Sequence, residues 1–186
     1  MSNILFASSN KNKYEEAKGI LSKFGISLKF FKCSLQEIQS DSLEKVAFHK
    51  ALDAFLLCSK PVIIEDDGLF INSLKGFPGP YSSFVFKTIG NEGILKLLKS
   101  KRSATFQSII AYCEQKDDVQ LFNASVSGQI PRKPAGKKWG YDPIFIPEGQ
   151  TKTYAQLEEK NLVSHRYLAI KKFANWYLHK QESNDR

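Results

Sequence analysis

The sequence has little cysteine and lacks the glycine-rich loops that commonly bind phosphate. Its three cysteines, Cys33, Cys58 and Cys113, are widely spaced and fit no zinc-binding pattern, so we expect free thiols in a reducing compartment. Neither G-x-x-x-x-G-K-S/T nor G-x-G-x-x-G occurs in the chain. This excludes a P-loop and a dinucleotide-binding fingerprint of the Rossmann type.

The sequence also lacks a long apolar run. No window approaches eighteen consecutive apolar residues, the length of a membrane span, and Met1 leads almost at once into a short strand rather than a signal peptide. We therefore expect a cytoplasmic protein that does not contact a membrane. The 186 residues, 42% of them hydrophobic and 25% charged, predict a single domain over 1–186 with two lobes and a substantial core.

Positive charge is in excess, with 27 Lys and Arg against 19 Asp and Glu, which gives a net charge of +8. Such a balance favours a polyanionic ligand, whether a nucleotide, a nucleic acid or an acidic surface. The basic residues are scattered rather than massed, and clustered carboxylates would repel nucleic-acid phosphates. These features argue against a nucleic-acid-binding module.

The chain is organised around residues 61–70, where an apolar run ends in three carboxylates and a glycine. Residues 61–64 are β-branched and without polar alternation, as in a strand buried on both faces of an α/β sheet. We expect Glu65, Asp66 and Asp67 to leave the core together at the end of this strand. Their oxygens are typical ligands of Mg²⁺, and a cation would relieve their mutual repulsion. The stretch predicts a metal site, with an acidic turn as the alternative.

The N-terminal segment predicts a junction between a strand and a helix that suits an anion. An apolar strand at 4–7 precedes two serines, Asn10 and a segment with helical apolar spacing. Asn10 suits the N-cap of the helix. Helix-start N–H groups, the serine hydroxyls and the charges of Lys11 and Lys13 would suit a phosphate. A well-capped helix with solvated lysines is the alternative.

The next segment predicts a second strand and a second helix. Residues 26–31 would form the strand, and a connector at 34–40 carries Glu37. Asp41 and Glu44 would form a capping box at the start of the helix. The expected buried stripe of this helix is Leu43, Val46, Ala47, Ala51, Ala54, Phe55 and Cys58. The opening order is then β-α-β-α-β, which predicts an α/β sheet with parallel pairing.

The middle of the chain predicts shorter elements and an antiparallel hairpin. Residues 69–74 are expected to form a further strand and residues 75–82 an ordered loop beside the carboxylates. Two short helices, broken at Gly90, would follow. Residues 104–114 and 119–130 are strand-like runs joined by a polar turn, so the sheet is expected to be mixed.

The last third contains an aromatic platform and a helix. Residues 139–142, Trp-Gly-Tyr-Asp, follow a basic loop; an exposed indole there would suit a nucleobase, and a solvated surface loop is the alternative. From Thr153 we expect a final helix whose buried stripe is Leu162, Ala169, Phe173 and Trp176. Charged residues near its start would normally lie on the surface, although Arg166 could offer planar bidentate donors to a phosphate or a purine carbonyl.

Taken together, these segments resemble the inosine/xanthosine triphosphate pyrophosphatase family, and they look most like its archaeal members. The resemblance runs from residue 4 to about residue 176. It rests on Ser8-x-Asn10-x-x-Lys13, Glu37, Glu65-Asp66-x-Gly68-Leu69, Gly76-x-Pro78-Gly79-x-Tyr81-Ser82, Gly140-Tyr141-Asp142-Pro143, Glu159-Lys160-Asn161 and Ser164-His165-Arg166. Each motif is weak alone, but so many in register are hard to obtain by chance.

The resemblance implies an α/β fold with a long twisted mixed β-sheet flanked by helices, in two lobes with the active-site cleft between them. It implies a cytoplasmic homodimer. The enzyme would be a nucleoside triphosphate pyrophosphatase that uses Mg²⁺. It would hydrolyse aberrant purine nucleoside triphosphates such as ITP, dITP and XTP to the monophosphate and pyrophosphate, and so remove them from the nucleotide pool.

The resemblance also implies roles for individual residues. Glu37 and Asp66 would bind the metal, and Asp66 would act as the catalytic base for the attacking water. The residues implied to bind substrate are Ser8, Ser9, Asn10, Lys11, Asn12, Lys13, Asp67, Trp139, Gly140, Tyr141, Asp142, Lys160, His165 and Arg166. The first six would hold the triphosphate, and residues 139–142 would line the base pocket. Lys160, His165 and Arg166 would contact the base and the phosphates.

Two residues depart from the pattern of the family. Asp67 stands where serine or threonine is common, so a third carboxylate would join the site and repel its neighbours. Trp139 stands where phenylalanine is commoner. The larger indole ring would change the width of the expected base pocket. Two other functions remain as alternatives. One is a pyrophosphatase for modified pyrimidine or methylated nucleotides, against which the Ser164-His165-Arg166 and Gly140-Tyr141-Asp142 motifs argue, and the other is a nucleotide sensor without turnover.

Overall fold

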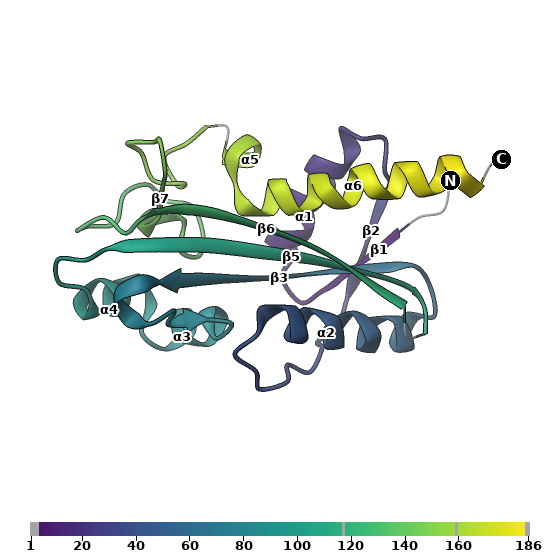
Figure 1. The fold of residues 1–186 in the computed structure, drawn as a ribbon, viewed down its shortest axis with the longest axis horizontal. Coiled ribbons are helices and arrows are strands. Elements are labelled where there is room, and N and C mark those ends of the chain that lie inside the picture. The colour runs from purple at the N-terminus through teal and green to yellow at the C-terminus, as the bar shows by residue number, and fades with distance from the viewer. Residues whose placement is uncertain (1–3, 117, 159, 185–186) are drawn as a thin grey trace. The chain divides into compact units, whose positions relative to one another are not determined.

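The computed structural model describes residues 4–116, 118–158 and 160–184, in which strands and helices alternate as expected (Figure 1). In chain order the elements are β1 (Ile4–Ser8), α1 (Lys11–Ser22), β2 (Leu28–Lys32), α2 (Leu43–Cys58), β3 (Val62–Ile71), the 3-10 helix η1 (Asn72–Leu74), β4 (Pro78–Gly79), α3 (Ser82–Thr88), α4 (Gly90–Leu97), β5 (Ser103–Gln115), β6 (Asp118–Gln129), the 3-10 helix η2 (Asp142–Ile144), β7 (Ile146–Pro147), α5 (Lys160–Val163) and α6 (His165–Asn184). In the described ranges, no helix combines the length and the apolar character needed to cross a membrane.

Within the described residues, seven strands form one mixed sheet. Their order is β2-β1-β3-β5-β6-β7, and β4 pairs with β3. β1 is parallel to both β2 and β3, so that Phe6 lies opposite Phe30 on one side and Ile63 on the other. β4 is antiparallel to β3, and β7 is antiparallel to β6. The predicted β-α-β-α-β opening and the mixed sheet are confirmed, and the two strands of the predicted hairpin are neighbours in the sheet.

The chain divides into two compact units. Unit 1 comprises Met1–Asp66, Ser108–Ala124 and Arg166–Arg186. Its core lies where α1 and α6 pack together on one face of the strands, with Ile20, Ile110 and Phe173 buried there. Figure 1 shows α2 on the opposite face of these strands. The apolar stripes predicted for α1 and α2 are the surfaces that make these contacts.

Unit 2 comprises Asp67–Gln107 and Ser125–His165 and has a core of its own. The ring of Phe106 lies at its centre, edge-on to Tyr141 and Phe145. The loop at 75–82 is ordered, as predicted, and pairs Gly79 with Leu69. A Cβ on Gly68 would approach the carbonyl oxygen of Gly79 to 2.6 Å, so the close pairing of β4 with β3 requires glycine there.

Strand β3 differs most from the expectation. The strand was expected to end at residue 64, with its carboxylates outside the core and a separate strand at 69–74. Instead β3 continues to Ile71, and Glu65 and Asp66 are only 5% and 8% exposed. Residues 72–74 form η1. The expectation was wrong because both buried carboxylates have cationic partners from distant segments, which the local sequence does not reveal.

The start of helix α2 was also misplaced. Its N-cap is Ser42 rather than Asp41, because the Ser42 hydroxyl accepts a hydrogen bond from the N–H of Lys45. Five residues of the predicted stripe are buried, and Phe55 and Cys58 are half-buried.

The final helix begins later than expected. Residues 153–157 form a turn in which the N–H groups of Gln156 and Leu157 donate to the carbonyl of Thr153. The helix α5 spans Lys160–Val163, and α6 begins at His165. Of its predicted stripe, Ala169 and Phe173 are buried, Trp176 is half-buried and Leu162 is exposed.

Candidate active site

The predicted phosphate-binding junction in unit 1 is a tightly capped helix start. The side-chain oxygen of Asn10 accepts hydrogen bonds from the N–H groups of Asn12 at 3.0 Å and Lys13 at 3.4 Å, which confirms Asn10 as the N-cap. The Ser8 hydroxyl accepts the N–H of Asn10 at 3.0 Å. These bonds fix the conformation of residues 8–13, but they occupy two of the N–H groups that were expected to face an anion.

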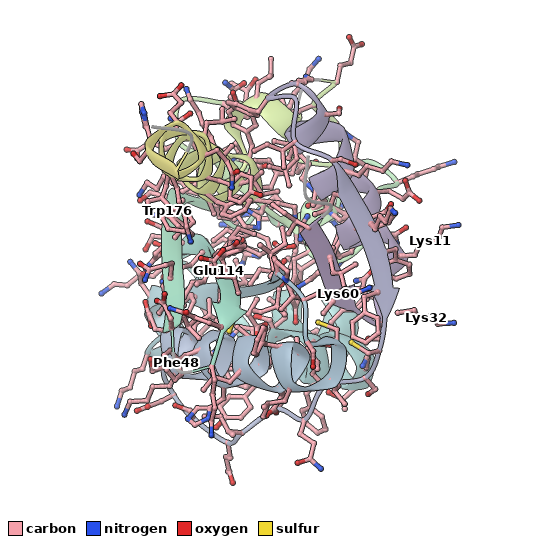
Figure 2. All side chains as sticks on the ribbon, turned by 90° about the vertical axis from the view of Figure 1, so that its right-hand side faces the viewer. Lys11, Lys32, Phe48, Lys60, Glu114 and Trp176 are labelled. Atoms are coloured by element: carbon pink, nitrogen blue, oxygen red, sulfur yellow. The ribbon has the colours of Figure 1, made fainter. Side chains whose placement is uncertain are left out.

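The two lysines of this junction differ in their surroundings. Lys11 is exposed and extends into solvent (Figure 2). Lys13 instead turns toward β3, and its ammonium group lies 3.5 Å from the backbone carbonyl of Glu65. Ser9 and Asn12 are exposed. Lys13 is therefore the lysine of this segment whose charge lies beside the carboxylate-bearing strand.

The two predicted metal ligands converge on a lysine that the sequence analysis did not single out. The ammonium nitrogen of Lys50 lies 2.9 Å from an oxygen of Glu37 and 3.1 Å from an oxygen of Asp66. Glu37 comes from the connector before α2, Asp66 from β3 and Lys50 from α2. Lys50 and Asp66 are largely buried, whereas Glu37 is mostly exposed. The arrangement brings two carboxylates together around one positive charge.

A signal for Lys50 was present in the sequence. Leu43, Val46, Ala47, Ala51 and Ala54 form the buried stripe of α2, and residue 50 lies on the same helical face, seven residues after the first of them. A lysine in an apolar stripe requires a buried anionic partner. The one lysine in this apolar stripe therefore indicates that a carboxylate, here Glu37 or Asp66, lies next to it.

Glu65 faces a different partner from its neighbour Asp66. Its two oxygens lie 2.7 and 2.8 Å from Nε of Arg166, and the hydroxyl of Ser108 donates to it at 3.0 Å. Arg166 also forms an ion pair with Glu16 of α1. Glu65 and Arg166 are both almost completely buried. This pair ties β3 to the first turn of α6, and Arg166 is not the surface charge that its sequence context would normally suggest.

In unit 2, the predicted base-binding segment 139–142 is held by several elements. The hydroxyl of Tyr141 donates to the carbonyl of Ser82 in α3 at 2.9 Å, and the side-chain nitrogen of Asn91 in α4 donates to the carbonyl of Gly140 at 3.1 Å. The N–H of Ala155 donates to the carbonyl of Asp142 at 3.2 Å. The segment therefore has a defined backbone conformation.

A buried ion pair lies at the end of this segment. The ammonium group of Lys160 is 2.7 Å from an oxygen of Asp142, and both side chains are almost fully buried. The same ammonium group lies 5.6 Å from the ring centre of Trp139, a distance typical of a cation–π contact. Trp139 is half-buried rather than fully exposed as expected. The structure thus brings together three of the residues predicted to contact the base.

The remaining predicted residues of unit 2 lie close to the same aromatic core. Burial raises the pKa of Tyr141, and the nearby charge of Asp67 raises it further. His165 is buried and stacks on Phe106, with ring centres 4.0 Å apart. Glu159, part of the motif that includes Lys160, lies outside the described residues.

The Ham1 family model matches residues 4–176. The chain belongs to the Ham1 family. A dITP/XTP pyrophosphatase of Methanopyrus kandleri is 49% identical over 94% of this chain and 95% of its own length. A second, from Hyperthermus butylicus, is 47% identical over 93% of each chain.

Solved structures agree with this assignment. A Ham1 protein from Coxiella burnetii, 29% identical, matches 96% of this chain and the whole of its own with a TM-score of 0.82. The expected resemblance to pyrophosphatases acting on inosine and xanthosine triphosphates, archaeal proteins among them, is therefore confirmed, as is the expected α/β class with a mixed sheet flanked by helices.

We predict that Glu65→Ala destabilises the protein by about 3–5 kcal/mol, because it leaves the charge of Arg166 buried without its main partner. The matched control is Glu182→Ala, which removes an exposed carboxylate from α6 and should change stability by less than about 0.5 kcal/mol. Urea unfolding followed by circular dichroism measures both. Equal stabilities for the two variants would contradict a supporting role for the Glu65–Arg166 pair.

Proposed function

We propose that this protein hydrolyses ITP, dITP and XTP to the nucleoside monophosphate and pyrophosphate, and so removes aberrant purine nucleotides from the nucleotide pool. The observation that carries the proposal is nearly full-length similarity to proteins named dITP/XTP pyrophosphatase, at 49% identity for one of them. The similarity covers the residues of both units. In unit 1, the carboxylates of Glu37 and Asp66 lie together around Lys50, which supports a role in binding a metal. In unit 2, Lys160 lies beside Asp142 and Trp139, which supports a role in binding the base.

The proposed cofactor is Mg²⁺, with Glu37 and Asp66 as its protein ligands. The donor set fits a hard cation, because two carboxylate oxygens from separate elements already lie within 3.1 Å of one ammonium nitrogen. Within the described ranges, no cluster of three or more His, Cys, Asp or Glu could hold a metal. Mg²⁺ commonly uses only one or two carboxylates, with water and phosphate oxygens as its other ligands. When bound, it would neutralise charge on the phosphates.

Asp66 is the proposed catalytic base. It would accept a proton from a water molecule whose oxygen bonds to the α-phosphorus, while the bond from that phosphorus to the departing pyrophosphate breaks. Its place in the middle of a strand and its contact with Lys50 restrict its orientation. The capped loop at residues 8–13 would hold the triphosphate, and Lys13 would neutralise the departing pyrophosphate.

For Arg166 we propose a supporting role in place of direct contact with the substrate. Its guanidinium group is engaged by Glu65 and Glu16, and its side chain is buried. Glu65 immediately precedes Asp66 in β3. By fixing Glu65, Arg166 would hold the strand that carries the catalytic carboxylate.

The proposed selectivity depends on the purine atoms that face unit 2. Trp139 would stack on the base, and Lys160 and His165 would lie near its edge. Hypoxanthine and xanthine present a carbonyl acceptor at position 6, whereas adenine presents an amino donor that would leave a protein donor unpaired. Buried donors such as Lys160 would therefore favour inosine and xanthosine nucleotides over ATP.

We predict that the wild-type protein releases pyrophosphate from ITP and XTP in the presence of Mg²⁺, and that chelation by EDTA abolishes this release. ATP should be nearly inert. Guanine shares the 6-carbonyl of hypoxanthine, so the low activity expected with GTP requires a clash with its 2-amino group. The assay measures pyrophosphate and orthophosphate separately, because a phosphatase would release only the latter. Pyrophosphate from pyrimidine nucleotides would change the proposed substrate. Binding of ITP without any hydrolysis would identify a nucleotide sensor and contradict the proposal.

We predict that Asp66→Asn lowers kcat for ITP by at least about a hundredfold, because the amide cannot accept the proton of the attacking water. Asp41→Asn serves as the control, since Asp41 is exposed. Circular dichroism should show the same fold for both variants. A kcat for Asp66→Asn within a few-fold of the wild type would exclude Asp66 as the base.

We also propose that the protein acts as a cytoplasmic homodimer. Unit 2 exposes three aromatic side chains within eight residues of sequence, Phe77, Tyr81 and Phe84, which are 40%, 41% and 68% exposed. Exposed apolar groups of this kind are typical of protein interfaces.

We expect sedimentation velocity to show a dimer that Phe84→Asp converts to a monomer, because a buried carboxylate would destabilise an apolar interface. Leu56→Asp, which alters a comparably exposed apolar residue of unit 1, should leave the dimer intact. A monomeric wild type would contradict the homodimer. A dimer that persists in Phe84→Asp and dissociates in Leu56→Asp would place the interface on unit 1.

A further inference from the structure

Asn91 contacts the base-binding segment from α4, and neither the sequence motifs nor the proposed chemistry assigns it a role. It is the second residue of α4, and its side-chain nitrogen donates to the carbonyl oxygen of Gly140 at 3.1 Å. Both residues belong to unit 2. Gly140 lies between Trp139 and Tyr141, so this hydrogen bond reaches the middle of the segment proposed to bind the base.

The hydrogen bond from Asn91 restricts the conformation of the peptide unit between Gly140 and Tyr141. Gly140 has a φ of +65°, in the left-handed region, where glycine moves between conformations more freely than other residues. Its carbonyl shares a planar peptide unit with the N–H of Tyr141. Fixing the carbonyl therefore fixes the direction of that N–H and the path of the chain on either side. The Tyr141 N–H donates no hydrogen bond within the part of the chain that the structure describes.

The side-chain oxygen of Asn91 shows that an asparagine at this position reduces the stability of the fold. Its side-chain oxygen is buried and has no hydrogen-bond donor among the described residues. Exchanging the oxygen and nitrogen of the amide would not help, because two acceptors would then face each other at Gly140. A buried acceptor without a donor destabilises a fold, and an apolar side chain of the same size would avoid that loss. The benefit of asparagine here is therefore its donor to Gly140.

We propose that Asn91 is a positioning residue for the base-binding segment: it orients the peptide unit between Gly140 and Tyr141 so that the segment accepts the purine of the substrate. This inference rests on the proposed function, since it assigns Asn91 to the base half of a nucleotide site. Asn91 acts through Gly140 and does not itself take part in the chemical step.

The test compares two near-isosteric variants of Asn91. Asn91→Asp replaces the donor by an acceptor, and Asn91→Leu removes both the donor and the buried acceptor. We expect each to raise KM for ITP about three- to tenfold, the range for the loss of one hydrogen bond, and to leave kcat within twofold. Inhibition by pyrophosphate, which has no base, should keep its wild-type inhibition constant. Asn72→Ala, an exposed asparagine of the same unit, is the control and should match the wild type.

The outcomes separate the inference from the proposed function. If Asn91 has only a structural role, the Asn91→Leu variant will have a lower melting temperature and will bind both ITP and pyrophosphate more weakly. That result would overturn the proposal. An unchanged KM for ITP in a well-folded Asn91→Leu variant would also overturn it, and this variant decides the matter if Asn91→Asp does not fold. If the wild-type protein fails to hydrolyse ITP, the proposed function fails, and the inference fails with it.

Discussion

The pairing of buried carboxylates on β3 with cations from distant helices is the interaction on which the structure of unit 1 depends. Glu65 and Asp66 are consecutive, so their side chains point to opposite faces of the strand. Each face supplies its own cation, Arg166 from α6 and Lys50 from α2. Removing one partner of a buried pair costs several kcal/mol, so the helices on both faces are tied to the same point of the sheet. Figure 1 shows these two helices on the two sides of β3.

These pairs would hold charged side chains in position for the proposed anionic substrate. A cation that is already bonded to a carboxylate keeps its position without a ligand, and little reorganisation is needed when the ligand binds. Lys50 holds the two proposed metal ligands together, and Lys160 is held by Asp142 beside Trp139. The same physical device therefore serves the proposed catalytic residues of unit 1 and the proposed base-binding residues of unit 2.

The division of residues between the units matches the chemistry of a nucleotide. All nucleoside triphosphates share the same phosphates, so the residues that bind them need only match charge and geometry. In unit 1, Lys13 is the proposed cationic group for the phosphates, and Glu37 and Asp66 are the proposed ligands of a Mg²⁺ that would neutralise them. Bases differ in their donors and acceptors, and the hydrogen-bonded segment at 139–142 in unit 2 is suited to read them. Discrimination between purines would then depend on how rigidly that segment is held. Asn91 is proposed to contribute to this rigidity through its hydrogen bond to Gly140.

The sequence by itself determined the local features: the N-cap at Asn10, the apolar stripes of α1 and α2, and the family to which the chain belongs. These depend on residues a few positions apart, or on motifs that keep their order along the chain. Only the tertiary structure decided that Glu65 and Asp66 stay inside the sheet, that Lys50 joins Glu37 to Asp66, and that Arg166 is buried. The partners of these charges come from other elements, and Glu65 and Arg166 are 101 residues apart. Whether a charge can be buried depends on its partners in space, and neighbours in sequence do not specify them.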